Sequence, residues 1–285
     1  MSRLTIYDVD YQLSVSGSGT PLVLLHGFTG RGANWQPVMP TLAQAHTVIT
    51  VDLLGHGETS APDDPQRYRM PEAAHDLAVL FKALSATPVH LLGYSMGGRL
   101  ALYTALHYPE LIASLILESA SPGLRTEGER EARRESDHAL AAFIEREGVP
   151  AFVDRWEALP LFATQRALPE ARQKALRAQR LQNRAHGLAN SLRGMGTGEQ
   201  PPLWDALSQL TMPVTLITGE QDTKFVQIAR EMQSHLREAE HVIIPEAGHT
   251  THLEQPALFV KAVEDALQTQ RRHRLQPPAH LPAPK

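Results

Sequence analysis

A serine flanked by glycines stands where an apolar strand would meet a helix. Gly-Tyr-Ser-Met-Gly at positions 93–97 follows the apolar stretch 89–92 and precedes a helix-compatible stretch at 99–107. In a Gly-x-Ser-x-Gly turn the serine backbone is strained, and the glycines let strand and helix approach closely enough to project the hydroxyl outward. The spacing therefore predicts a reactive serine at Ser95. The alternative is a chance match in an ordinary strand-to-helix turn.

Two further residues could activate that serine. A hydroxyl is a weak base and a weak nucleophile at neutral pH, so it needs an imidazole to take its proton and a carboxylate to orient the imidazole. Asp222 and His249 each follow a predicted strand, as Ser95 does, and such loops meet at one edge of a parallel sheet. The chain order predicts a Ser-Asp-His catalytic triad. Taken singly, Asp222 could cap a helix, and His249 is one of fourteen histidines.

Strands that alternate with helices would position these loops. Short apolar runs predict strands at 22–25, 48–51, 89–92, 115–118, 213–219 and 241–245, and helical periodicity predicts helices at 71–84, 99–107 and 254–268. Residues 4–15 indicate an N-terminal hairpin. This rhythm predicts an α/β fold with a mostly parallel central sheet and helices on both faces.

The rhythm stops between residues 121 and 210, where no convincing strand occurs. Helical segments are expected there at 126–147, 150–158, 169–185 and 187–193. We expect residues 1–120 and 211–270 to form the core, 121–210 a helical cap, and the proline-rich, basic stretch 271–285 a disordered tail. Helical insertions of this kind usually carry substrate specificity.

Composition narrows the class of protein. The chain has 285 residues, 42% of them hydrophobic, and a net charge of −4, which favours neither nucleic acid nor an anionic membrane as a partner. The absence of cysteine rules out disulfides and thiol nucleophiles. The chain does not start with a signal-like pattern, and it has no apolar run near 20 residues. We therefore expect a cytoplasmic protein without membrane insertion. Beyond His249-x-x-His252 the histidines lack metal-ligand spacing, so no metal and no cofactor is expected.

The motifs together resemble the α/β-hydrolase superfamily over nearly all of residues 4–270. They are His26-Gly-Phe28, Asp52-Leu-Leu-Gly-His-Gly57, the serine motif, Gly219-Glu-Gln-Asp222 and Gly248-His249. The resemblance implies the α/β-hydrolase fold and an oxyanion hole made by the backbone N–H groups of Phe28 and Met96. Because this fold hosts many reactions, it implies a class of mechanism and no substrate.

A second set of residues carries a narrower resemblance. It comprises Tyr94-Ser-Met-Gly-Gly-Arg99, Ser121-Pro-Gly-Leu124 followed by Arg130, Arg133, Ser136 and Asp137, Trp156 before Pro160-Leu-Phe162, Arg180 with Gly187, and Asp222-Thr-Lys-Phe225. This set is similar to the 2-succinyl-6-hydroxy-2,4-cyclohexadiene-1-carboxylate (SHCHC) synthases of menaquinone biosynthesis, which eliminate pyruvate from a cyclohexene bearing three carboxylates. The resemblance implies Arg99, Arg133 and Arg180 as substrate-binding arginines, and Tyr94 and Trp156 as pocket aromatics. Three guanidinium groups could hold three carboxylates in bidentate pairs.

Each of these assignments has an ordinary alternative. Arg99 could pair with an acid on its own helix face. Arg130 or Arg134 could take the place of Arg133, because all three lie within about one helical turn. Arg180 could belong to a solvated basic helix face, and Trp156 could be a core residue of the cap.

The implied function is a lyase that eliminates pyruvate from 2-succinyl-5-enolpyruvyl-6-hydroxy-3-cyclohexene-1-carboxylate, with Ser95 as the base that removes a ring proton. One alternative is a serine esterase or carbon-carbon bond hydrolase with the same triad, and another is a non-catalytic ligand receptor on this fold. An apolar cap pocket would favour neutral esters, whereas convergent arginines favour a polyanionic small molecule.

Overall fold

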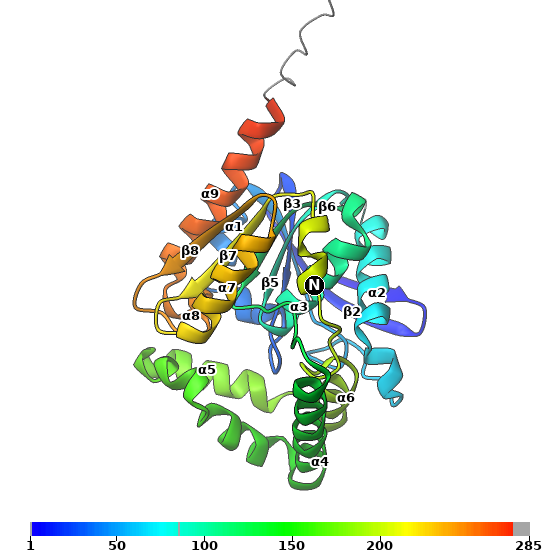
Figure 1. The fold of residues 1–285 in the computed structure, drawn as a ribbon. Coiled ribbons are helices and arrows are strands. Elements are labelled where there is room, and N and C mark those ends of the chain that lie inside the picture. Colours follow the sequence, from blue (N-terminus) through cyan, green and yellow to red (C-terminus); the bar gives the residue numbers. More distant parts are fainter. Residues whose placement is uncertain (1, 85, 276–285) are drawn as a thin grey trace, which may run out of the picture.

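A single eight-stranded sheet runs through the part of the chain that the structure describes, residues 2–84 and 86–275 of this computed structural model (Figure 1). Its strands are β1 (Ser2–Ile6), β2 (Val9–Ser16), β3 (Thr20–Leu25), β4 (His46–Val51), β5 (Val89–Tyr94), β6 (Ile112–Glu118), β7 (Val214–Gly219) and β8 (Ala239–Ile244). They lie in the order β1-β2-β4-β3-β5-β6-β7-β8. The pairs β1·β2 and β2·β4 are antiparallel, and every neighbouring pair from β4 to β8 is parallel. The structure confirms the predicted N-terminal hairpin and mostly parallel sheet.

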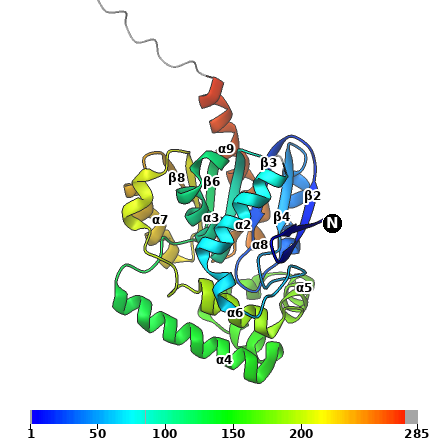
Figure 2. The ribbon, with the colours of Figure 1, turned by 90° about the vertical axis from the view of Figure 1, so that its right-hand side faces the viewer.

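Helices cover both faces of this sheet (Figures 1 and 2). Helices α2 (Met70–Ala83), α3 (Met96–His107) and α7 (Thr223–His235) contribute apolar residues to one core cluster, and α1 (Met39–Leu42) and α9 (Pro256–Leu275) contribute to the other. The central strands are mostly apolar because they are covered on both sides, as β6 shows with every residue buried. This arrangement confirms the predicted α/β architecture.

The insertion between β6 and β7 is helical, and within the described residues 121–210 contains no strand. It comprises α4 (Glu127–Glu157), the 3₁₀ segment η4 (Pro160–Ala167), α5 (Glu170–Leu181) and α6 (Ala185–Met195), which lie together on one side of the sheet in both ribbon views. Helix α4 bends at Gly148 (φ +81°), between the two stretches expected as separate helices. We propose that residues 121–210 form a helical cap over a core formed by residues 1–120 and 211–270.

The C-terminal helix is longer than expected. Instead of one helix over 254–268, a short turn α8 (Thr251–Glu254) is followed by α9, which continues to Leu275. The expected tail at 271–285 therefore starts too early, and its remaining residues, 276–285, lie outside the described residues. No helix of the described chain is both long and apolar enough to cross a bilayer.

Two buried histidines lie at the carboxyl edge of the sheet. His26 follows β3; its Nε2 accepts the N–H of Leu53 at 2.9 Å, which leaves Nδ1 to donate to the carbonyl of Gly27 at 2.8 Å. His56 donates from Nδ1 to the Leu54 carbonyl at 3.0 Å. Burial lowers the pKa of His26 to about 4 and that of His56 to about 3, so both are neutral at neutral pH.

The free energy of unfolding should therefore fall as the pH drops from about 6.5 to 4. In the unfolded chain both imidazoles bind a proton near pH 6.5, whereas the folded chain resists protonation until about 4 for His26 and about 3 for His56. Each histidine should contribute a slope of about 1.4 kcal/mol per pH unit in that window and none above it. Urea denaturation at a series of pH values measures the slope. His56→Gln should flatten it relative to the surface variant His138→Gln, and equal slopes in the two variants would contradict the assignment.

Candidate active site

The strained turn between β5 and α3 places Ser95. Its φ is +50° and its ψ is −109°, a conformation that costs of order 1–3 kcal/mol and persists only where the surroundings enforce it. The Ser95 N–H donates to the Glu118 carbonyl at 2.8 Å, which ties the turn to β6. A Cβ at Gly97 would lie 2.4 Å from the Leu25 carbonyl oxygen, and one at Gly93 would lie 2.4 Å from the Gly97 oxygen. The two glycines are therefore required for strand and helix to pass this closely.

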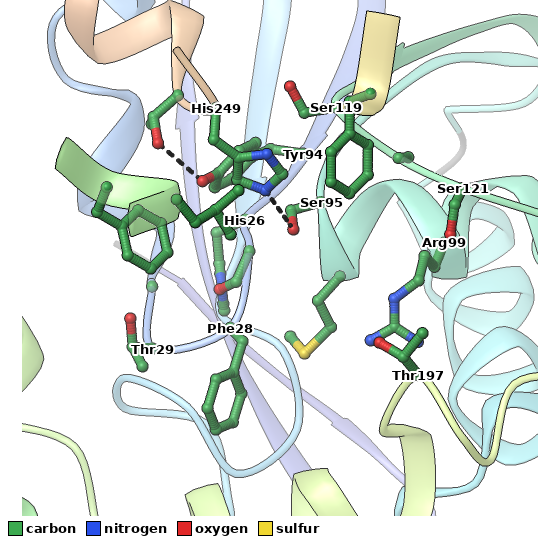
Figure 3. Close-up of a pocket in the computed structure, with 18 of the residues that line it drawn as sticks. His26, Phe28, Thr29, Tyr94, Ser95, Arg99, Ser119, Ser121, Thr197 and His249 are labelled. Atoms are coloured by element: carbon green, nitrogen blue, oxygen red, sulfur yellow. Dashed lines mark hydrogen bonds between the residues drawn. The ribbon is translucent and has the colours of Figure 1, made fainter. Parts of the chain in front are cut away.

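The structure brings Ser95, Asp222 and His249 together, and Figure 3 shows the contact between His249 and Ser95. His249 Nε2 lies 3.1 Å from Ser95 Oγ, and its Nδ1 lies 2.6 Å from Asp222 Oδ2. His249 is 2% exposed and Asp222 is 8% exposed. Since an ionised carboxylate only accepts, Nδ1 carries the hydrogen and Nε2 of the neutral ring accepts from the serine hydroxyl. Asp222 does precede α7, but its side chain makes no capping hydrogen bond there.

Two of the residues that line a cavity beside Ser95 carry the backbone N–H groups expected for an oxyanion hole. Met96 is the first residue of α3, so its N–H has no carbonyl in a preceding helical turn. Phe28 lies in the loop after β3, and no hydrogen bond from its N–H is found within the described chain. Both residues line the cavity, as the oxyanion-hole expectation requires. Their role with a bound oxyanion stays a proposal.

A cavity of about 280 Å³ lies between the core and the cap. The core supplies Ser95 and His249 to its wall, and the cap supplies Trp156 and Arg180. Lys224, from the Asp-Thr-Lys-Phe motif, also lines it. All ten residues expected at the site except Asp222, which lies behind His249, are part of this wall. Aromatic and cationic side chains therefore surround the serine.

Arg99 faces the cavity without an ion pair to any described residue (Figure 3). Its Nη1 donates to the Met195 carbonyl at 3.0 Å and to Gln200 Oε1 at 3.3 Å. Burial and, to a smaller extent, the neighbouring charge of Arg133 together lower the pKa of Arg99 to about 10, so the group is cationic at neutral pH. The alternative of a pairing acid on the helix face is not what the structure shows.

Of the three adjacent arginines on α4, Arg133 is the one that reaches the cavity. Its Nε donates to Asp137 Oδ1 at 2.8 Å, and its side chain is 44% exposed. Arg130 and Arg134 instead pair with Glu127 and do not line the cavity. The ion pairs with Glu127 thus hold Arg130 and Arg134 away from the cavity, whereas Arg133 lines it.

Arg180 is buried rather than solvated, at 6% exposure. Its Nη1 donates to Glu157 Oε1 and its Nη2 to Gln165 Oε1, both at 3.0 Å, while its Nε has no partner in the described residues. Trp156 packs edge-on against Phe28 with ring centroids 5.3 Å apart. Its indole N–H is also buried without a partner among the described residues. Trp156 is therefore both a packing residue of the cap and part of the cavity wall.

Known proteins share this sequence and fold. Residues 20–256 match the sequence model described as alpha/beta hydrolase fold. A Bacillus subtilis (strain 168) protein provisionally named 2-succinyl-6-hydroxy-2,4-cyclohexadiene-1-carboxylate synthase is 46% identical over 268 residues, which cover 93% of this chain and 97% of that protein. The synthase of that name from Enterobacter sp. (strain 638) is 35% identical over 249 residues, 86% of this chain and 91% of its own. The chain belongs to the SHCHC synthase family of the α/β-hydrolase fold.

A solved structure agrees with this membership. MenH from S. aureus superimposes with a TM-score of 0.88 at 35% identity, covering 92% of this chain and 98% of that one. The similarity includes the cap as well as the core, because almost the whole of both chains is matched. The arrangement of the cavity wall is thus built on a fold shared with this family.

One residue that the sequence does not single out ties the site together. The carboxylate of Glu118 is fully buried and accepts from Thr251 Oγ1 at 2.6 Å, from His252 Nδ1 at 2.7 Å and from the His252 N–H at 3.0 Å. Its carbonyl accepts the N–H of Ser95. His252, unassigned from the sequence, packs on Trp35 with ring centroids 4.2 Å apart. Glu118 therefore links the serine turn to α8, directly after His249. An acid that ends an apolar strand was the available signal.

Removing this carboxylate should destabilise the SHCHC-synthase-like fold strongly. Glu118→Ala leaves three buried donors without an acceptor, and loss of one partner of a buried pair typically costs about 3–5 kcal/mol. Chemical denaturation measures the change in the free energy of unfolding. The control, Glu72→Ala on the exposed side of α2, should change it by less than about 0.5 kcal/mol. Equal stability of the two variants would show that Glu118 is not a structural tie.

Proposed function

We propose that this chain eliminates pyruvate from 2-succinyl-5-enolpyruvyl-6-hydroxy-3-cyclohexene-1-carboxylate to give SHCHC, a lyase reaction of menaquinone biosynthesis. The observation that carries the proposal is the presence of Arg99, Arg133 and Arg180 in the wall of one cavity with Ser95. The substrate bears three carboxylates, and guanidinium groups bind carboxylates in strong charge-assisted pairs. The synthase relatives support the same assignment.

In this proposal Ser95 acts as a base and forms no acyl intermediate. His249, oriented by Asp222, takes the serine proton as Ser95 Oγ removes the ring proton beside the succinyl ketone. The ketone oxygen gains negative charge, which the N–H groups of Phe28 and Met96 are placed to stabilise. The ring double bond then shifts from position 3 to give the 2,4-diene. The bond from ring carbon 5 to oxygen breaks, and the released enolpyruvate takes up a proton to become pyruvate.

Ser95→Ala should abolish pyruvate release. Loss of a positioned general base typically costs about 10²–10⁴ in rate. A coupled assay of pyruvate formation measures kcat, with Ser234→Ala, a surface serine of α7, as the control that should match the wild type. Near-normal turnover in Ser95→Ala would refute the mechanism. Fast hydrolysis of p-nitrophenyl acetate by the wild type without elimination would instead favour a serine esterase.

Arg133→Ala should raise KM and lower kcat/KM, because a lost charged hydrogen bond costs roughly 1.5–3 kcal/mol, or about 10- to 150-fold. Arg99→Ala should behave similarly. The matched control is Arg134→Ala, since Arg134 lies one residue further along α4 and pairs with Glu127 outside the cavity. A larger loss in the Arg134 variant than in the Arg133 variant would show that the wrong arginine had been chosen.

A further inference from the structure

A chain of hydrogen bonds connects the cap to the residues next to Ser95 and His249 in the core. Arg180 Nη2 lies 3.0 Å from Gln165 Oε1, Gln165 Nε2 lies 3.0 Å from Thr250 Oγ1, and Thr250 Oγ1 lies 2.8 Å from the Tyr94 hydroxyl. Arg180 and Gln165 belong to the cap, on α5 and η4. Tyr94 directly precedes Ser95, and Thr250 directly follows the triad histidine. All four members line the cavity.

The direction of this chain is set at its cap end. A guanidinium only donates, so the amide atom of Gln165 that faces Arg180 must be its oxygen, and the amide nitrogen then faces Thr250. That nitrogen also only donates. The Thr250 hydroxyl oxygen is therefore an acceptor toward Gln165, whatever it does toward Tyr94.

The second step follows from burial. Thr250 is 2% exposed, and within the described residues its hydroxyl has no neighbour besides Gln165 and Tyr94 that could accept its hydrogen. A buried hydroxyl hydrogen without an acceptor costs about 1–3 kcal/mol, so Thr250 donates to Tyr94. Hydrogen bonds that run in one direction also strengthen one another. Both residues line the cavity, but Tyr94 as a whole residue is half-buried whereas Thr250 is buried, so a group in the cavity is the acceptor left for the hydroxyl hydrogen of Tyr94.

We propose that Gln165 is a positioning residue that fixes Thr250 as the donor to Tyr94, so that Tyr94 donates its hydroxyl hydrogen to an oxygen of the bound polycarboxylate. The inference deepens the proposed function and rests on it for the identity of the substrate. Burial raises the pKa of the Tyr94 phenol well above its usual value, so the group keeps its hydrogen at neutral pH. Tyr94 thereby supplies an uncharged hydrogen-bond donor to the substrate beside the positively charged arginines.

Gln165→Glu reverses the direction without removing the contact to Arg180. The new carboxylate still accepts from the guanidinium, but it cannot donate to Thr250, so Thr250 must donate to it and Tyr94 must donate to Thr250. We expect about a 10-fold or larger loss of kcat/KM for pyruvate release, matching Tyr94→Phe. The surface variant Ser234→Ala, on α7, should remain within a factor of about two of the wild type.

The double variant separates this effect from simple charge repulsion. If Gln165→Glu acts through Tyr94, adding it to Tyr94→Phe should cause no further loss. A full additional loss in the double variant would mean that the new charge repels the substrate directly, and would overturn the proposal. Wild-type kcat/KM in Gln165→Glu would overturn it too. Melting temperatures check that each variant is folded.

Two readouts do not depend on the proposed reaction. Labelling of Ser95 by a neutral fluorophosphonate should proceed at the wild-type rate in Gln165→Glu, because the triad is untouched; a slower rate would place the effect on the triad and contradict the inference. Calorimetric binding of benzene-1,3,5-tricarboxylate should show the same non-additive losses as the kinetics. If the wild type releases no pyruvate but this binding pattern holds, the proposed function fails while the role of Gln165 stands.

Discussion

The close passage of α3 over the end of β3 is the constraint on which the site depends. The backbone at Ser95 can adopt its left-handed conformation because glycines at 93 and 97 leave room for the carbonyl of Leu25 and for each other. That approach also brings the first N–H of α3 to the loop after β3, where Phe28 lies. The same packing of α3 against the end of β3 therefore accounts for the strain at Ser95 and for the nearness of the Met96 and Phe28 N–H groups.

Electrostatics separate Arg99, on α3, from the arginines of the cap. Arg134 and Arg177 pair with carboxylates near the surface, where such pairs contribute little to stability. Arg99 is buried with carbonyl oxygens as its partners and with Arg133 nearby, an arrangement that disfavours its charge. A cation held in this way gains from a bound anion, because the attraction between the two charges offsets the desolvation penalty of Arg99 and its repulsion by Arg133. The arrangement costs stability in the empty protein and favours a polyanionic ligand.

The grouping of Ser95, Asp222 and His249 could be predicted from the sequence because each lies in a loop that follows a strand. The serine motif and the strand before it depend on only a few neighbouring residues. Asp222 and His249 follow in the chain order expected after such a serine, and the sheet then brings the three loops to one edge. Helical spacing could not separate Arg133 from Arg130 and Arg134, since all three lie within about one turn; the pairing of the latter two with Glu127 does so in three dimensions. The end of α9 was misplaced because a basic, polar stretch carries no apolar stripe to indicate a helix.

Glu118 and Gln165 escaped prediction for a different reason. The sequence places Glu118 at the end of a strand and Gln165 only within the cap, between two expected helices, and neither has a sequence neighbour with which it acts. Their partners lie far along the chain, Thr251 and His252 for the first and Arg180 and Thr250 for the second. Buried polar side chains of this kind become visible only when donors and acceptors are matched in space.

An arrangement such as Ser95, His249 and Asp222 could serve hydrolysis or elimination, so the surrounding groups must decide between them. Ester hydrolysis requires a carbonyl carbon within reach of Ser95 Oγ, whereas elimination requires an acidic C–H there. Three cations at separate points of the wall would fix the position and the rotation of a tricarboxylate ring, and with them the atom that faces the serine. Under the proposed function, Ser95 is a base of fixed position in the core. The arginines bind the substrate in one orientation and so determine which of its bonds lies next to Ser95.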